Sequence, residues 1–461
     1  MPDTAEPGPA VLESVLVANR GEIARRVIAT ARRMGIRAIA VYSEADAGLP
    51  FVREADEAVL IGPPPPARSY LDAGAILRAA RDTGARAVHP GYGFLSENGL
   101  FARTVIDAGL AWVGPPPSAI EQMGDKISAR NLMAAAGVPV APGTTEPVND
   151  AGEAVAAAAF IGYPVMVKAA AGGGGIGMSA AADPEQLVAA FETARSRAER
   201  FFGNPAILLE RYVAPARHVE VQILGLPGGR VLALGERDCS VQRRHQKVAE
   251  ETPSPGVGPA LRARMQEAAV RAGETVGYLG AGTVEFLVDA RTADFTFLEM
   301  NTRLQVEHPV TEMVTGIDLV EQQLRIAAGG DVSVGAGPCA TGRVPASGHA
   351  IELRVYAEDP DRFLPSPGTI TGWTEPSGEG IRVDAGYEAG NQVTQFYDPL
   401  LAKLCVWGPD RDEALRRARD AVASFRITGL KTNLAFHADL LDSEEFSDGG
   451  YDTLVVSRLR P

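Results

Sequence analysis

Polar and apolar residues alternate through residues 299–307, which read Glu-Met-Asn-Thr-Arg-Leu-Gln-Val-Glu. If this segment is an extended strand, every second side chain points to the same face. One face would then carry two carboxylates, two amides and a guanidinium, from Glu299, Asn301, Arg303, Gln305 and Glu307. These groups are enough to hold a cation and an anion side by side. An ordinary amphipathic strand with a solvated face shows the same alternation, so the pattern alone does not decide.

A second strand, expected over residues 281–288, supports the interpretation as a binding site. Residues 289–294 have the composition of a turn, so the two strands would form a hairpin with Glu285 opposite Glu299. Like charges that face each other on a sheet are destabilising, and a divalent cation between them would remove the conflict. Mg²⁺ and Mn²⁺ both suit a site made of oxygen ligands. We expect Pro309 to end the second strand of the hairpin, with the residues just before it in a loop.

A run of glycines at residues 172–177, interrupted only by Ile176, follows a strand expected to end at Lys168. Many glycine runs are flexible linkers. This one is not a P-loop, because no Gly-Lys-Ser/Thr follows it. It also lacks the acidic residue that a dinucleotide fingerprint places at the end of the next strand. We interpret it as a loop that closes over nucleotide phosphates, with Lys168 supplying a positive charge.

Residues 236–247 are strongly basic in an acidic chain, which has a net charge of −14 and a pI of about 5.1. The overall charge argues against nucleic acid or an anionic membrane surface as a general partner. An anionic ligand would therefore need a local basic cluster. This segment is either a solvated basic loop or a wall that binds phosphates or a small oxyanion; its basic residues are Arg237, Arg243, Arg244, His245 and Lys247.

Length and composition indicate a globular enzyme of several domains. The chain has 461 residues, which suggests two to four domains, and no stretch approaches the roughly 18 apolar residues of a membrane span. Residues 1–10 lack the apolar segment of a signal peptide. The three cysteines are far apart and lack metal-ligand spacing, which is typical of a reducing cytoplasm. We therefore expect a cytoplasmic protein that contacts neither membranes nor nucleic acids.

The order of expected elements divides the chain into blocks. Residues 1–13 are expected to be a disordered tail. Residues 14–43 have a β-α-β pattern, and further alternation predicts a doubly wound domain up to residue 123. Residues 125–212 are richer in alanine and glycine, and residues 213–330 contain the hairpin. A Gly/Pro-rich linker (331–347) then leads to a mixed segment, residues 348–455, with a helix over 410–425.

Together, these segments resemble the biotin carboxylase family of the ATP-grasp superfamily over residues 14–455. The motifs that carry the resemblance are Ala18–Ala24 (Ala-Asn-Arg-Gly-Glu-Ile-Ala), His89–Asn98, Gly124–Lys126, Glu236–Lys247 and Glu299–Glu312. The resemblance implies an α/β and α+β fold in three domains. These are a doubly wound N-terminal domain (14–123), an ATP-grasp domain (124–330) with a mobile lid at about 140–212, and a mixed C-terminal domain (348–455).

The resemblance also implies a role for individual residues. Lys126 and Lys168 would contact ATP phosphates. Glu210, Arg211 and Val213 would form the adenine hinge. The other ATP-binding positions would be Gly173, Gly174, Gly175, His218, Gln242, His245, Glu285 and Glu299. The metal ligands would be Glu285, Glu299 and Asn301, and the bicarbonate pocket Lys247, Arg303, Gln305, Val306 and Glu307. Glu307, expected beside Arg303, would be the general base, and Arg354 would stabilise the enolate of biotin.

The implied reaction is the ATP- and bicarbonate-dependent carboxylation of biotin N1′ through carboxyphosphate, with Mg²⁺ or Mn²⁺. No Met-Lys-Met biotinylation segment is present, so we expect biotin on a separate carrier protein (a biotin carboxyl carrier protein), further partnership with a carboxyltransferase subunit, and a homodimer. Acetyl-CoA is the default acceptor of the complex. Pyruvate, propionyl-CoA and urea carboxylases remain alternatives, as do a carboxylate–amine ligase and a non-catalytic nucleotide-binding subunit.

The chain departs from the family pattern at three places. Ile176 and Ser179 stand where the family's glycine loop usually has basic residues, which lowers the positive charge expected near the phosphates. Phe51 replaces a frequent histidine. The segment 378–382 lacks an aromatic residue that some members use in a dimer contact, which weakens the expectation of a homodimer.

Overall fold

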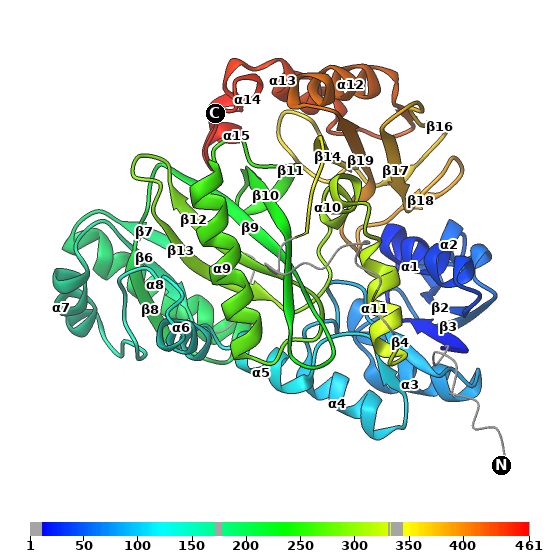
Figure 1. Ribbon diagram of the computed structural model, residues 1–461, viewed down its shortest axis with the longest axis horizontal. Helices are drawn as coiled ribbons and strands as arrows, with labels where there is room; N and C mark the ends of the chain where they lie inside the picture. The colour runs from blue at the N-terminus through cyan, green and yellow to red at the C-terminus, as the bar shows by residue number, and fades with distance from the viewer. Residues whose placement is uncertain (1–11, 171–177, 331, 333–343, 461) are drawn as a thin grey trace, which may run out of the picture.

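The computed structural model describes residues 12–170, 178–330, 332 and 344–460 (Figure 1). Residues 1–11 of the predicted tail, the glycine run 172–177 and most of the predicted linker lie outside these ranges. The tail was predicted to extend to residue 13, but Leu12 is buried in the core and the carbonyl of Glu13 accepts from the backbone N–H of Arg37, so the prediction is wrong for these two residues. The fold is mixed α/β, as predicted, with a parallel sheet in the N-terminal part and a large antiparallel sheet in the middle of the molecule. Within the described ranges, no helix is long and apolar enough to cross a lipid bilayer.

The N-terminal part is a doubly wound domain, which confirms the prediction from the β-α-β pattern. Its five parallel strands have the order β3-β2-β1-β4-β5. The strands are β1 (Ser14–Val17), β2 (Arg37–Ser43), β3 (Glu57–Gly62), β4 (Ala87–His89) and β5 (Ala111–Trp112). The helices are α1 (Gly21–Arg33), α2 (Pro50–Glu54), α3 (Ala73–Asp82), α4 (Gly99–Asp107) and α5 (Pro117–Gly124).

The crevice of this parallel sheet is closed. In doubly wound sheets, ligands bind where the strand order reverses, here at the carboxyl ends of β1 and β4. That position is filled by Asn19, whose side-chain amide donates 2.7 Å hydrogen bonds to the carbonyls of Pro90 and Tyr92. Asn19 thus joins the chain after β1 to the chain after β4.

An eight-stranded antiparallel sheet forms the middle of the molecule, in the order β13-β12-β9-β10-β11-β14-β19-β17. It joins strands from both sides of the predicted linker, because β11 pairs with β14. The strands are β9 (Ala216–Gly225), β10 (Val231–Arg243), β11 (Gln246–Thr252), β12 (Gly280–Asp289), β13 (Phe295–Asn301), β14 (His349–Tyr356), β17 (Ile381–Ala385) and β19 (Leu400–Gly408).

Helices cover this sheet on both of its halves. Helix α9 (Pro259–Thr275) packs on β9 and β10, and α10 (His308–Thr315) packs on β14 and β19. Helix α12 (Arg411–Ser424) begins at Asp410, whose carboxylate accepts from the backbone N–H of Glu413, as expected for an N-cap. The remaining C-terminal elements are β15 (Gly368–Thr369), β16 (Gly372–Thr374), β18 (Gln392–Val393), β20 (Arg426–Thr428), α13 (Leu434–Asp442), α14 (Glu444–Ser447) and α15 (Val455–Leu459).

A small lid projects from the body (Figure 1). Its three-stranded sheet, β7-β6-β8, carries two helices and has an apolar core of its own. The elements are β6 (Val165–Ala169), β7 (Ser179–Ala181), β8 (Ile207–Arg211), α7 (Ala151–Ile161) and α8 (Pro184–Phe202), with α6 (Lys126–Ala135) leading into them. A unit with a separate core can move against the body without disrupting either one.

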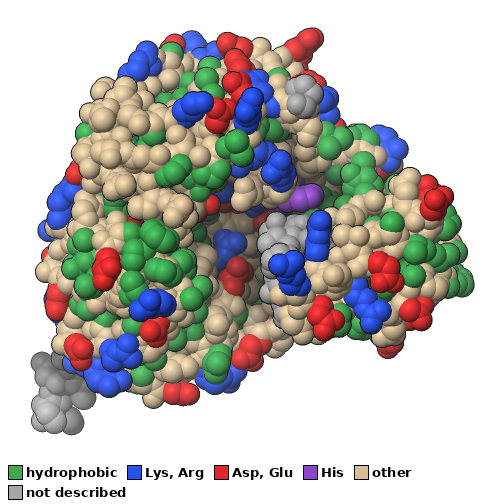
Figure 2. Space-filling model, turned by 180° about the vertical axis from the view of Figure 1, so that it is seen from behind, with side chains coloured by type: hydrophobic (Ala, Val, Ile, Leu, Met, Phe, Trp, Pro, Cys, Tyr) green, Lys and Arg blue, Asp and Glu red, His purple; other side chains and the backbone are tan. Residues whose placement is uncertain are grey.

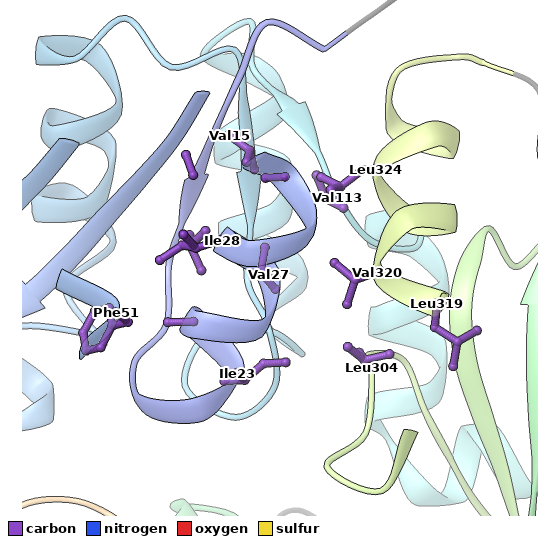
Figure 3. Close-up of a cluster of buried hydrophobic side chains, with 14 of the residues drawn as sticks. Val15, Ile23, Val27, Ile28, Phe51, Val113, Leu304, Leu319, Val320 and Leu324 are labelled. Atoms are coloured by element: carbon purple, nitrogen blue, oxygen red, sulfur yellow. The ribbon is translucent and has the colours of Figure 1, made fainter. Parts of the chain in front are cut away.

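A shared apolar core fixes the N-terminal domain to the body. Figure 3 shows Ile23 and Val27 of α1 facing Val320 and Leu324 of α11 (Leu319–Ala327) and Leu304. All five belong to one buried cluster. Because Leu304 lies within the alternating segment 299–307, this cluster also anchors the chain that follows β13. Phe51, which replaces a frequent histidine, is fully buried in the same cluster.

Candidate active site

The predicted hairpin is confirmed. Strands β12 and β13 pair antiparallel with Glu285 directly opposite Glu299, and residues 289–294 form the turn. The strand ends at Asn301 rather than at Pro309, so the prediction for Pro309 is wrong. Pro309 instead lies in the first turn of α10, where its missing N–H costs no hydrogen bond.

The hairpin adds to a row of charged residues that crosses four strands. Glu220 of β9 lies opposite both Glu285 and Arg237 of β10. The row therefore runs Arg237, Glu220, Glu285, Glu299, and we call its three acidic members the carboxylate row. Figure 2 shows a hollow between the lid and the body in which basic and acidic side chains lie close together. Three adjacent carboxylates need cations nearby to remain ionised.

Lys247 supplies most of that positive charge. Its Nζ lies 2.6 Å from Glu220 Oε2, 2.8 Å from Glu285 Oε1 and 2.6 Å from Glu307 Oε1. Burial alone would lower the pKa of Lys247, but the three carboxylates outweigh it and hold the pKa well above the ordinary value. Lys247 thus joins the carboxylate row to Glu307.

Glu307 lies between two cations. Its second oxygen, Oε2, accepts a 2.9 Å hydrogen bond from Arg354 Nη2, and the residue is only 2% exposed. Burial alone would raise the pKa of Glu307, but Lys247 and Arg354 outweigh it and hold the pKa well below the ordinary value. The carboxylate is therefore ionised and can accept a proton from a ligand that displaces one of these cations.

Arg303 does not contact Glu307, although the two side chains were expected to lie side by side. Its Nε donates to Glu97 Oε2 at 2.8 Å and its Nη2 donates to Asn301 Oδ1 at 2.7 Å. Glu97 belongs to the segment that follows β4 in the N-terminal domain. The turn after Asn301 swings Arg303 towards that domain, whereas Gln305 and Glu307 stay buried in the body.

The basic segment 236–247 does not form one anion-binding wall. Arg237 is 0% exposed, and its guanidinium donates to Glu220 (2.6 Å) and Gln305 Oε1 (2.7 Å), among others. Arg243 donates to Glu358 at 2.9 Å. Arg244 and His245 are exposed at the turn between β10 and β11. The register of β10 and β11 shifts between Asp238 and Gln242, and the chain turns at Arg244 and His245, so the basic residues of the segment do not form one continuous surface.

Gln305 links Arg237 to the carboxylate row. Its oxygen accepts from Arg237, so its amide nitrogen faces the site and donates to Glu285 Oε1 at 2.8 Å. The neighbouring carbonyl of Val306 accepts from Lys403 Nζ at 3.0 Å. Gln305 and Val306, two residues of the expected bicarbonate pocket, are thus held by the fully buried side chains of Arg237 and Lys403.

Glu299, with Asn301 two residues further along β13, lies at the end of the carboxylate row away from Arg237, and we call this end the open end. Among the residues the structure describes, Glu299 has no ion pair; its nearest hydrogen-bond donor is Asn301 Nδ2, at 3.5 Å. Burial and the neighbouring Glu285 raise the pKa of Glu299, against the effect of Lys126. An oxygen-rich site with an uncompensated carboxylate fits Mg²⁺ or Mn²⁺.

A second group of possible metal ligands, His218, Glu220 and Glu285, lies nearby. His218 Nε2 is 3.0 Å from Glu285 Oε2. Lys247 already hydrogen-bonds both carboxylates, so this position is occupied by a cation of the protein itself. The Glu285–Glu299 pair differs in that one of its carboxylates, Glu299, has no ion pair among the described residues.

Several residues expected to bind ATP lie on the lid strands and at the start of α6. Lys168 of β6 hydrogen-bonds Glu210 of β8, so a phosphate would have to compete with this carboxylate for the lysine. Lys126 begins α6, and burial lowers its pKa, partly offset by Glu299. His218 Nδ1 lies 2.8 Å from Gln242 Nε2.

Other expected ATP contacts are placed differently or lie outside the description. Arg211 donates to the carbonyl of Ile161 within the lid, with a 2.8 Å bond from Nε. Val213 is half-buried just after β8. His245 lies in the β10–β11 turn, where its φ of 68° is unusual for a residue other than glycine. Gly173 to Gly175 lie outside the described residues.

Several site residues were not predicted from the sequence. Glu220 belongs to the alternation His218-Val-Glu220-Val-Gln222, the same signal that identified residues 299–307. Glu97 lies within the motif His89–Asn98, but its contact with Arg303 could not be inferred from spacing. Glu250, which lies 2.5 Å from Arg354, sits in a strand whose partner is about a hundred residues away.

Comparisons with known proteins agree with this architecture. Residues 11–120 match the biotin carboxylase N-terminal domain, residues 125–334 the ATP-binding domain of the carbamoyl-phosphate synthase L chain, and residues 352–458 the biotin carboxylase C-terminal domain. A biotin carboxylase from Halalkalibacterium halodurans is 50% identical over 97% of this chain and 98% of its own length. A pyruvate carboxylase subunit from Methanothermobacter thermautotrophicus is 48% identical over 98% of this chain and 90% of its own length.

A solved structure is also similar to this chain in fold and sequence. The biotin carboxylase domain dimer of Hydrogenobacter thermophilus 2-oxoglutarate carboxylase, in complex with MgADP, ADP and bicarbonate, superposes with a TM-score of 0.92. It is 43% identical, with 97% of this chain and 98% of that chain covered.

A sheet with paired carboxylates beneath a separate lid, matched by an ATP-binding domain, defines the protein as an ATP-dependent ligase. The chain belongs to the biotin carboxylase family, the ATP-dependent component of biotin-dependent carboxylases.

Proposed function

We propose that this enzyme carboxylates biotin N1′ with ATP and bicarbonate, and that the hollow between lid and body is its active site. The observation that carries the proposal is the position of Glu307, a buried ionised carboxylate held by Lys247 at 2.6 Å and by Arg354 at 2.9 Å. This arrangement holds the proposed base beside two cations that could bind an anionic substrate within reach of it.

Bicarbonate would bind against Lys247, Arg303, Gln305, the Val306 backbone and Glu307. Gln305 presents its amide nitrogen to the site because its oxygen is held by Arg237. An incoming anion would take over part of the positive charge of Lys247. The pKa of Glu307 would then rise, and the carboxylate would accept the bicarbonate proton. The deprotonated oxygen would attack the γ-phosphoryl group of ATP.

The other end of the row would serve the phosphates. Lys126 and Lys168 would neutralise charge on the transferred group, with Lys168 released from Glu210 when the nucleotide binds. Glu285, Glu299 and Asn301 would hold Mg²⁺ or Mn²⁺. When bound, the metal would polarise the phosphoryl oxygens. Glu210, Arg211 and Val213 would form the adenine hinge, with His218, Gln242, His245 and Gly173–Gly175 completing the nucleotide site.

The carboxyphosphate formed in this way would break down to CO₂ and phosphate beneath the closed lid, where water is excluded. The released phosphate would take the N1′ proton of biotin. Arg354, which is 8% exposed, would stabilise the resulting enolate, and N1′ of the enolate would attack CO₂ to form carboxybiotin. The charge of Arg354 becomes available once Glu307 is protonated.

Biotin would arrive on a biotin carboxyl carrier protein. A carboxyltransferase would use the product. The dimer of the 2-oxoglutarate carboxylase domain supports a homodimer here, and we propose a cytoplasmic location. Acetyl-CoA is the proposed acceptor, with pyruvate, propionyl-CoA and urea as alternatives, since the relatives include a subunit of pyruvate carboxylase. Isolation of the complex and assay with each acceptor decides between them.

The proposal is tested by phosphate release from purified protein supplied with ATP, Mg²⁺, bicarbonate and free biotin. Turnover should depend on both bicarbonate and biotin. Turnover that is absent, or unchanged when biotin is omitted, contradicts the proposal. The carboxybiotin product, trapped at alkaline pH, provides an independent readout.

A further inference from the structure

Arg354 is shared by two carboxylates, only one of which has a part in the proposed reaction. Its Nη2 lies 2.9 Å from Glu307 Oε2 and 2.5 Å from Glu250 Oε1. Glu250 is 1% exposed. A buried charge next to Arg354, the group that would contact biotin, affects how much positive charge Arg354 can offer to biotin.

Glu250 also faces a second buried carboxyl group. It lies directly opposite Glu352 in the pairing of β11 with β14, and Arg354 is two residues further along β14 on the same face. Glu352 is 0% exposed, and its Oε2 accepts a hydrogen bond from Cys405 Sγ at 3.4 Å. Within the described residues, Glu352 Oε1 has no hydrogen-bond partner.

Two opposed buried carboxyl groups cannot both stay ionised when the arginine beside them is shared with a third. Burial raises the pKa of Glu250 to about 7, with Arg354 lowering it and Glu307 raising it. Burial raises the pKa of Glu352 well above the ordinary value, although Lys403 lowers it. The charged or titratable groups that face this pair are Lys247 of β11, Arg354 and Tyr356 of β14, Cys239 of β10, Glu307 before α10, and Lys403 and Cys405 of β19.

We propose that Glu250 is a positioning residue that shares Arg354 with Glu307 and sets how much positive charge Arg354 offers to the biotin ring. This inference rests on the proposed function. When Glu250 is protonated, Glu307 alone balances Arg354, and the arginine becomes fully available once Glu307 has taken the bicarbonate proton. When Glu250 is ionised, Arg354 stays balanced and offers less positive charge to the carbonyl oxygen of the biotin ring, so bound biotin and its enolate are both held less strongly.

The test compares the pH dependence of the KM for free biotin in wild type and E250Q, from pH 6 to 8.5, at saturating MgATP and bicarbonate. Glutamine keeps an oxygen beside Arg354 but cannot ionise. We expect the KM of the wild type to rise about tenfold as Glu250 loses its proton, the effect of a change of one pKa unit. The KM of E250Q should rise less than about twofold.

E352Q is the matched control, because Glu352 lies on the same face but does not contact Arg354. It should keep the wild-type rise in the KM for biotin. The inference is overturned if E250Q keeps the rise, if E352Q rather than E250Q abolishes it, or if the wild type shows none. Should E250Q fail to fold, as judged by thermal melting, the wild type and E352Q still decide, since both must show the rise. Wild-type protein without biotin-dependent turnover would instead refute the proposed function.

Discussion

The two ends of the carboxylate row differ in how their charge is compensated. Glu220 and Glu285 share Lys247, and Arg237 closes the row on their side. At the other end, Glu299 has no ion pair among the described residues and Lys126 influences it only at longer range. The compensated end is already organised by the body of the protein, whereas the Glu299 carboxylate at the open end is left without an ion pair in the part of the chain that the structure describes. This contrast indicates which part of the site is built before ligands bind.

The largest expected effect comes from the compensated end. E307Q removes the proposed base but keeps the shape of the side chain between Lys247 and Arg354. Biotin-dependent phosphate release should fall by about 10²–10⁴-fold, the usual contribution of a positioned base, while binding of MgATP changes little. E321Q, which removes a surface carboxylate on α11, is the control. Near-wild-type turnover in E307Q would show that the compensated end does not contain the base.

The contrast predicts opposite stability effects for the two opposed glutamates in metal-free protein. E285Q removes a carboxylate that lies 2.8 Å from Lys247 and 3.0 Å from His218. It should lower the melting temperature, because removing one partner of a buried ion pair costs about 3–5 kcal/mol. E299Q removes a repulsion between cross-strand neighbours and should raise the melting temperature, with a gain of about 0.5–1 kcal/mol.

Metal binding provides the second part of this comparison. In Mg²⁺, E299Q should lose the thermal stabilisation that wild type gains, because a ligand is missing. Melting temperatures of E285Q and E299Q, each measured in EDTA and in Mg²⁺, separate the loss of the repulsion from the loss of the metal ligand. If E299Q is destabilised in EDTA, the open end must contain a compensating contact, and the contrast between the ends is wrong.

The pH dependence of stability should also differ between the two ends. The pKa of Glu299 is raised by burial and by Glu285, so its contribution to stability is present below pH 4.5 and lost as pH rises through the folded pKa. Burial would raise the pKa of Glu307, but Lys247 and Arg354 lower it, so its contribution is present above pH 4.5 and lost as pH falls through the folded pKa.

Melting curves in EDTA between pH 3.5 and 8 test these signs. The gain of E299Q over wild type should grow above pH 4.5, whereas the deficit of E307Q should shrink below it. Each variant serves as the control for the other, because the rest of the titrating groups are the same. Parallel difference curves would contradict the assignment of the two ends.

The sequence predicted the open end better than the compensated one, for a physical reason. Glu285 and Glu299 face each other across a six-residue turn, so period-two alternation and turn composition were enough to pair them. Glu307 and Arg354 meet only because β11 pairs with β14 across the predicted linker. No local signal encodes that pairing. The resemblance to a known family identified Arg354 and Glu307 as candidate site residues. It did not identify Glu250, whose position beside Arg354 depends on the register of these strands.

The smallest expected effect concerns the contact between domains. Glu97 fixes Arg303 through its Nε and also accepts from the backbone N–H of Thr302, but its side chain is 43% exposed. Ion pairs this exposed are worth at most about 1 kcal/mol, so E97Q should raise the KM for bicarbonate by about threefold to fivefold and leave that for ATP unchanged. The surface variant E57Q, which weakens an exposed pair with Arg37, is the control. A loss of more than about thirtyfold would mean that the N-terminal domain, and not only the eight-stranded sheet, organises the compensated end.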